Sequence, residues 1–190
     1  LIVEPGTLFA EQKLDLPDED TEREMYARTA EILAEYGFFQ YEISNYARPG
    51  YACLHNIGYW TGVEYLGLGL GASSLVGGKR FQVTADLNRY LVFTKEELAA
   101  GAQYEEIHEL SRQERMEEFM FLGLRKTKGI SKKEFIERFG CSMDSVYGKP
   151  LIESMKQGMM KEEGDRVFLT QDGTLVSNQV LCEFLFDEEV

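Results

Sequence analysis

One short stretch of the chain gathers side chains that could bind a metal. Residues 51–65 read YACLHNIGYWTGVEY and hold one of the two histidines and the only tryptophan, with His55, Asn56 and Tyr59 in the pattern H-N-x-x-Y. A neutral imidazole is a common ligand of iron, and flat apolar rings beside it could cover a planar macrocycle. These residues predict a metal-porphyrin site with His55 as the iron ligand. The alternative is a core histidine whose ring nitrogens are both hydrogen-bonded.

The cysteines do not form a recognisable metal or redox motif. Cys53, Cys141 and Cys182 are odd in number and far apart, without the spacing C-x-x-C or C-x-x-x-C-x-x-C. Iron-sulfur, zinc and dithiol sites need such spacings. We therefore expect three reduced thiols, as in a cytoplasmic protein.

Composition limits the classes of function. The chain has 190 residues, 44% of them hydrophobic, and its 33 acidic and 20 basic residues give a net charge of -13. This length and apolar content suffice for one domain or two small ones. The negative charge argues against nucleic acid as a partner. The sequence has no apolar run long enough to span a bilayer and no visible export signal, so we expect a cytoplasmic location.

The first part of the chain has the pattern of an α/β fold. Residues 1–4 predict a strand, Asp18 is placed to cap a helix that ends at Gly37, and residues 38–43 predict the next strand. A strand-helix-strand unit of this kind builds parallel sheets and α/β barrels. Because the sequence LIVEPGTLF opens without Met, we expect the chain to be the C-terminal piece of a longer polypeptide.

A glycine-rich segment follows the histidine. Residues 65–75 read YLGLGLGASSL, with Gly67, Gly69 and Gly71 at every second position. In a strand this spacing bares one face, which would let a flat ligand or another backbone approach closely; a tightly packed strand is the alternative. The run lacks the G-x-G-x-x-G spacing of a dinucleotide site. Gly77-Gly78 predicts a hairpin turn into residues 80–84.

The last ninety residues predict a winged-helix-like domain of α+β type. Two capping boxes, Ser111-x-x-Glu114 and Ser131-x-x-Glu134, predict the first two helices, and a third helix begins or bends at Pro150. Residues 159–162 and 166–169 predict two short strands, and Thr170 caps a final helix. Winged helices often bind DNA, but here acidic residues outnumber basic ones, and a solvated helix edge accounts for the basic cluster at residues 125–133.

Several ordered blocks resemble one family. YEISNYARPGY (residues 41–51), LHNIGYW (54–60), EYLGLGLGASS (64–74) and EEFMFLGLRKTKGIS (117–131) are similar to the oxygen-independent coproporphyrinogen III oxidase-like radical S-adenosylmethionine proteins. H-N-x-x-Y followed by Trp resembles the heme chaperone branch of that family.

The resemblance implies a fold and a set of ligands. Residues 1–100 would supply the last strands and helix of an incomplete radical S-adenosylmethionine α/β barrel, and residues 101–190 the winged-helix-like domain. His55, Asn56 and Tyr59 would bind heme, His55 as the iron ligand. Tyr51, Leu54 and Trp60 would cover the macrocycle, and Cys53 is either a thiolate ligand or a buried small residue. Val3 and Ser73 would approach S-adenosylmethionine. The [4Fe-4S] cluster and S-adenosylmethionine are expected only in a full-length protein.

Three functions follow as expectations. The first is a heme-binding chaperone that delivers heme to respiratory proteins at the membrane. The second is an oxygen-independent coproporphyrinogen III oxidase, whose sequences resemble H-R-N-x-x-G-Y, whereas His55-Asn56 here runs directly to Tyr59-Trp60. The third is an interaction module whose C-terminal region docks a partner or a second copy, as in a homodimer.

Overall fold

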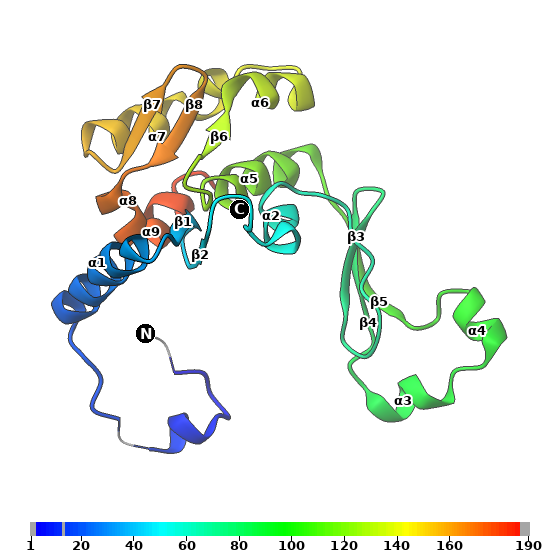
Figure 1. Cartoon of the computed structure of the whole chain (residues 1–190). Helices are drawn as coiled ribbons and strands as arrows, with labels where there is room; N and C mark the ends of the chain where they lie inside the picture. The colour runs from blue at the N-terminus through cyan, green and yellow to red at the C-terminus, as the bar shows by residue number, and fades with distance from the viewer. Residues whose placement is uncertain (1–2, 13, 187–190) are drawn as a thin grey trace. The chain divides into compact units, whose positions relative to one another are not determined.

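The computed structural model describes residues 3–12 and 14–186 and contains two compact units. By contacts within the chain, the first unit is Leu1–Ala52 and the second is Cys53–Val190 (Figure 1). The expected domains, residues 1–100 and 101–190, stay a prediction. No helix in the described ranges is long and apolar enough to cross a membrane.

The first unit contains one long helix and a small hairpin. Its elements are η1 Leu8–Glu11, α1 Glu19–Glu35, β1 Phe39–Glu42 and β2 Asn45–Ala47. Asp18 caps α1 as predicted, because its carboxylate accepts a hydrogen bond from the Thr21 amide at 2.8 Å.

The second strand of this unit was not predicted. β1 pairs antiparallel with β2, and the buried carboxylate of Glu42 accepts a hydrogen bond from the Ser44 amide at 3.0 Å, which stabilises the turn between them. The predicted strand at residues 1–4 falls partly on Leu1 and Ile2, outside the described residues, while Val3 and Glu4 do not lie in a strand. The parallel pairing expected of a strand-helix-strand unit is therefore not seen in the described part of the chain.

The second unit begins with a short helix and a three-stranded antiparallel sheet. Its first elements are α2 Leu54–Trp60, β3 Ser73–Val76, β4 Lys79–Val83, α3 Leu87–Val92, α4 Lys95–Ala99 and β5 Tyr104–Glu109. The predicted Gly77-Gly78 turn is confirmed, since Val76 pairs with Lys79 and both glycines have positive φ, +59° and +73°. α3 and α4 lie beyond the end of the β3-β4-β5 sheet (Figure 1).

The glycine-rich run is a loop, so the prediction of a strand through residues 65–75 was wrong for most of its length. Residues 66–72 lie in no strand, Tyr65 forms an isolated bridge with Leu75, and only residues 73–75 of the run belong to β3. Gly69 and Gly71 have φ of +102° and +68°, which are not strand values. Close backbone approach does occur at Gly67, where a Cβ would lie 2.2 Å from the carbonyl oxygen of Ser73. The group that approaches Gly67 is therefore the backbone of the chain itself.

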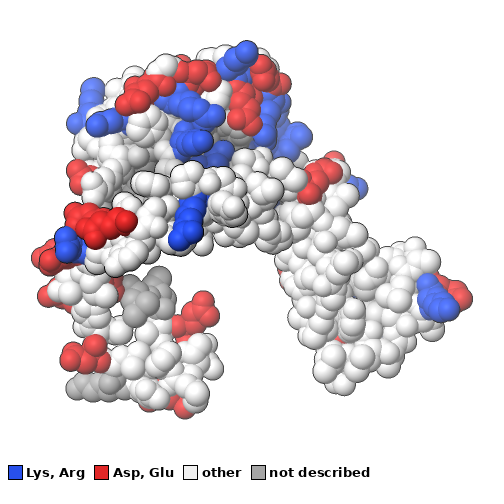
Figure 2. Space-filling model, in the orientation of Figure 1, with Lys and Arg blue, Asp and Glu red and all other residues white. Residues whose placement is uncertain are grey.

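The C-terminal part has the predicted winged-helix-like arrangement of helices around a small antiparallel sheet in the order β6-β8-β7. Its elements are α5 Arg112–Gly123, β6 Ile130–Ser131, α6 Lys132–Phe139, α7 Met143–Lys156, β7 Met160–Glu163, β8 Arg166–Leu169, α8 Gln171–Leu175 and α9 Ser177–Cys182. In Figure 2, basic and acidic side chains intermingle over this region.

Two helices of this region depart from regular geometry. α7 is kinked at Tyr147, three residues before Pro150, because proline cannot donate a backbone hydrogen bond and its ring clashes with the preceding turn. The single final helix expected after Thr170 is in fact α8 and α9, which are separated at Val176 (φ -113°, ψ 26°). Thr170 caps α8 as predicted, accepting a hydrogen bond from the Gly173 amide at 3.0 Å.

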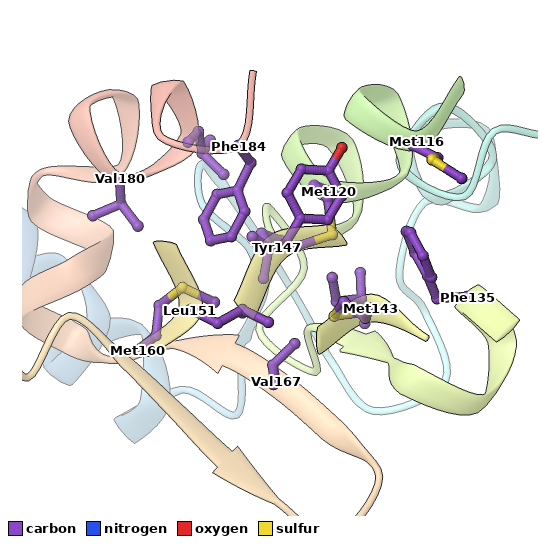
Figure 3. Close-up of a cluster of buried hydrophobic side chains, with 13 residues drawn as sticks. Met116, Met120, Phe135, Met143, Tyr147, Leu151, Met160, Val167, Val180 and Phe184 are labelled. Carbon is purple, nitrogen blue, oxygen red and sulfur yellow. The ribbon is translucent and has the colours of Figure 1, made fainter. Parts of the chain in front are cut away.

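The main hydrophobic core lies among these helices and the sheet they cover (Figure 3). Phe135 is fully buried, and its ring centroid lies 4.7 Å from that of Phe139, 5.5 Å from that of Phe119 and 6.0 Å from that of Tyr147. Several methionines complete the cluster: Met116, Met120, Met143 and Met160. Unbranched thioether side chains suit the irregular spaces between short helices that cross at different angles.

The capping box of α5 gives a pH-dependent contribution to stability. The Glu114 carboxylate accepts hydrogen bonds from the Ser111 amide at 2.7 Å and from His108 at 2.6 Å, the latter with Nε2 as donor. Hydrogen bonds from the backbone and side chain of Ser111, and then from His108, lower the pKa of Glu114 from 4.5 to about 2.

The direction of this effect can be measured. Because the pKa is depressed in the folded state, the stabilisation is fully present above pH 4.5 and is lost as the pH falls toward about 2. We expect Glu114→Gln to be less stable than the parent chain above this window, with the difference shrinking inside it. Urea unfolding of both proteins across the range tests this, and a constant difference would contradict it.

Candidate functional site

The helix α2 positions the residues of the H-N-x-x-Y pattern. It begins after Cys53 and ends at Thr61, whose hydroxyl donates a hydrogen bond to the Ile57 carbonyl at 2.9 Å. At 3.6 residues per turn, side chains four positions apart lie on one face of a helix. His55 and Tyr59 therefore share a face of α2.

Three rings form a row along this face. The ring centroids of His55 and Tyr59 are 4.8 Å apart at an interplanar angle of 80°, and those of Tyr59 and Tyr65 are 4.7 Å apart at 78°. Edge-to-face contacts of this kind are favourable and fix ring orientation. Tyr59 is partly buried, so it orients the imidazole next to it.

The imidazole of His55 is accessible. His55 is exposed, and its ring makes no hydrogen bond with any residue that the structure describes. A neutral imidazole keeps one nitrogen lone pair for a ligand. The alternative expectation, a buried core histidine with both nitrogens engaged, does not fit this environment.

One accessible imidazole suits heme better than a bare metal ion. Within the described ranges, no cluster of three or more His, Cys, Asp or Glu side chains could hold a metal ion. A porphyrin supplies the equatorial ligands of its own iron and needs only axial ligands from the protein. His55 could supply such a ligand alone.

The other predicted heme contacts have mixed environments. Leu54 in α2 is 82% exposed and Tyr51 in the first unit is 81% exposed, while Asn56 is partly buried. Cys53 is exposed, so the expectation that it is a buried small residue was wrong. The two predicted S-adenosylmethionine contacts differ in exposure. Val3 is partly buried in the first unit, and Ser73 is exposed at the start of β3.

Trp60 lies on a different side of α2. It lies five positions after His55, which corresponds to about 140° around a helix. The guanidinium of Arg125, just beyond the end of α5, lies 4.4 Å from the centroid of its ring. Trp60 and Thr61 line a cavity of about 420 Å³, whose lining does not include His55, Asn56 or Tyr59.

Two residues that contact side chains of α2 were not predicted from the sequence. Tyr65 extends the row of rings, and its position directly before the glycine run gave a weak signal that it lies near α2. Arg125 contacts Trp60 from the far end of α5, and no local pattern could have predicted this contact.

Comparison with known proteins places this chain in a family. The HemN C-terminal domain family matches residues 110–176. The heme chaperone HemW of Bacillus subtilis (strain 168) is 38% identical over 189 residues, covering 97% of this chain and 49% of the relative. This chain belongs to the HemW and HemN family. The family's heme chaperones HemW of Lactococcus lactis and of Escherichia coli K12 are 36% and 32% identical over 99% and 97% of the chain.

The fold agrees with this assignment. The Escherichia coli coproporphyrinogen III oxidase HemN, described as a radical SAM enzyme, aligns with a TM-score of 0.68 and 16% identity, covering 90% of this chain and 42% of HemN. At that identity the likeness concerns the fold alone. The chain spans about half the length of the curated relatives it matches.

Proposed function

We propose that this chain carries the heme-binding part of a heme chaperone, with His55 as an axial ligand of the heme iron. The observation that carries the proposal is the exposed imidazole, which is oriented by Tyr59 and makes no hydrogen bond to the residues described. Similarity along nearly the whole chain to proteins called heme chaperone HemW supports it.

Each neighbouring residue has a role in this proposal. Asn56 would hold the macrocycle or a propionate by hydrogen bonding, and Tyr59 would set the orientation of the imidazole or add a second polar contact. The exposed side chain of Leu54 would offer apolar cover to a flat ligand, and the exposed thiol of Cys53 is a further candidate ligand. The assignment of Tyr51 to the heme contacts stays a prediction.

The wider activity is also a proposal. The protein would pass heme to respiratory proteins at the membrane from the cytoplasm, alone or as a homodimer. A full-length protein would add a [4Fe-4S] cluster and S-adenosylmethionine. The assignment of Val3 and Ser73 to that cofactor stays a prediction.

The two histidines of the chain offer a matched test. We expect His55→Ala to weaken heme binding at least tenfold, because the iron loses its protein ligand, while His108→Ala binds like the parent chain. Both side chains are exposed, so both variants should fold. The measurement is a heme titration of the chain, followed by the Soret band. Equal affinity in the two variants would contradict the assignment of His55.

Tyr59→Phe refines the same titration. The phenylalanine ring keeps the packing against His55 and Tyr65 and removes only the hydroxyl. Affinity near the parental value would assign Tyr59 an orienting role, whereas a loss comparable to that of His55→Ala would assign the hydroxyl a direct contact with heme.

The competing function is oxidation of coproporphyrinogen III. The direct His55-Asn56 sequence favours the chaperone, because the oxidase resembles H-R-N-x-x-G-Y. Formation of protoporphyrinogen IX by a reconstituted full-length protein would decide for the oxidase.

A further inference from the structure

The cavity beside Trp60 has features of a binding site that the proposed heme ligands do not use. It has a volume of about 420 Å³ and lies between the end of α2, the β3-β4 turn and the helices α5 and α6. Its size falls in the range of small-molecule sites. All of its lining residues belong to the second unit.

The walls of the cavity are partly aromatic. Trp60, Phe119 and Phe139 line it, and the guanidinium of Arg138 lies 5.4 Å from the centroid of the Phe119 ring. The indole Nε1 of Trp60 is buried and has no hydrogen-bond partner in the described part of the chain. A ligand in the cavity could accept that hydrogen bond, which would satisfy a buried donor.

The acidic residues of the cavity are already engaged. Glu134 pairs with Arg138 at 2.6 Å, and Glu118 pairs with Arg80 at 2.7 Å. Glu64 accepts a hydrogen bond from the Gly77 amide at 2.7 Å. Two of the three carboxylates are therefore paired with a cation, and the third accepts a backbone hydrogen bond.

Two cationic side chains that line the cavity form no ion pair with a described carboxylate. The ammonium of Lys126 makes no hydrogen bond or ion pair with the residues described, although Glu134 acts on it electrostatically at longer range. Arg115 donates only to the Ser111 carbonyl, at 3.4 Å, and pairs with no carboxylate in the described ranges. The cavity thus combines flat apolar walls with two available positive charges.

We propose that this cavity is a binding site, distinct from the heme site, for a small organic anion with a flat apolar body. Its acidic group, a carboxylate or a sulfonate, would be held by Lys126, with Arg115 as a second positive charge in the lining, and its body would pack against Trp60 and the phenylalanines. Charge-assisted hydrogen bonds give such a site its affinity, and the aromatic walls give it shape.

The environment of Lys126 supports this assignment. Burial lowers the pKa of Lys126, and the positive charges of Arg166 and Arg138 act in the same direction. An amine held there without a close carboxylate reduces the stability of the fold, and such groups gather at functional sites. We expect Lys126→Met to unfold at the same temperature as the parent chain or a higher one.

Trp60 provides the readout. It is the only tryptophan of the chain and lines the cavity, so energy transfer from Trp60 to anilinonaphthalene sulfonate, a flat aromatic sulfonate, reports binding of the dye, and variants of the lining residues assign the dye to this cavity. We expect saturable binding that becomes about tenfold weaker in Lys126→Met and is weakened less in Arg115→Met. Lys128→Met removes the same charge two residues away, outside the cavity lining, and should bind like the parent.

Three results would overturn the proposal. They are unchanged affinity in Lys126→Met, an equal loss in Lys128→Met, and non-saturable dye uptake by the folded chain. His55→Ala separates this site from the heme site. It should leave dye binding unchanged whether or not it alters heme binding, and a loss of dye binding in that variant would also contradict a distinct site.

Discussion

Replacing Phe135 with alanine is expected to lower the free energy of unfolding by about 3–5 kcal/mol. The side chain is fully buried and contacts three aromatic rings, those of Phe119, Phe139 and Tyr147. Deleting it removes apolar surface from the core and leaves a space that these rings, each held by other neighbours, cannot fill. Chemical denaturation followed by circular dichroism measures the change.

Ile136 is the matched control for this variant. It is the next residue of α6 and is 47% exposed. Ile136→Ala should cost only about 1 kcal/mol, since part of the side chain is already in water. If both variants lost the same stability, the aromatic cluster would not be the centre of the core.

Replacing Gly129 with alanine should cost roughly 3 kcal/mol or more, from two causes. Gly129 has a φ of +59°, and an L residue in this region loses about 1–2 kcal/mol. In addition, its Cβ would lie 2.0 Å from the Val167 carbonyl oxygen, a backbone atom of β8. The two strands would have to separate where β6 pairs with β8, and overpacking of this kind costs about 1–3 kcal/mol.

Gly164 separates the two causes. It lies in the β7-β8 turn with a φ of +60°, but a Cβ there would meet no atom within 4 Å. Gly164→Ala should therefore lose only the conformational part, about 1–2 kcal/mol. Denaturation of both variants gives the difference directly, and equal losses would exclude a steric clash at Gly129.

Local signals in the sequence predicted the helix starts and the tight turns. Asp18, Ser111 and Thr170 each cap the helix that their position predicted, because a side-chain oxygen reaches an amide only two or three residues away. Gly77-Gly78 forms the predicted turn for a similar reason, since both residues need positive φ. These interactions are contained within a few consecutive residues.

Pairings between distant segments could not be predicted in this way. β6 is two residues long and exists because Ile130 pairs with Val167, far along the chain. The glycine run has an alternating pattern that is typical of a strand, but its backbone turns repeatedly at Gly69 and Gly71. Glycines at every second position leave one face without side chains only where the backbone is extended as a strand.

The candidate site shows the same division. No helix was predicted around His55, although the four-residue spacing of His55 and Tyr59 corresponds to one helical turn, and the structure has their rings in contact on α2. The separation of Trp60 from the face that carries these rings follows from its position on α2, whereas its contact with Arg125 depends on how α5 packs against α2. Ligand roles for these residues stay predictions until the titrations are done.

One seven-residue helix carries both His55 and Trp60. A ligand that rotates or shifts α2 at one end must change the environment of the other end, because so short a rod has no internal hinge. Thermodynamic linkage then applies. If an anion bound beside Trp60 changes the affinity for heme by some factor, bound heme changes the affinity for that anion by the same factor. Binding of the macrocycle would in this way respond to the concentration of the anion that occupies the cavity beside Trp60.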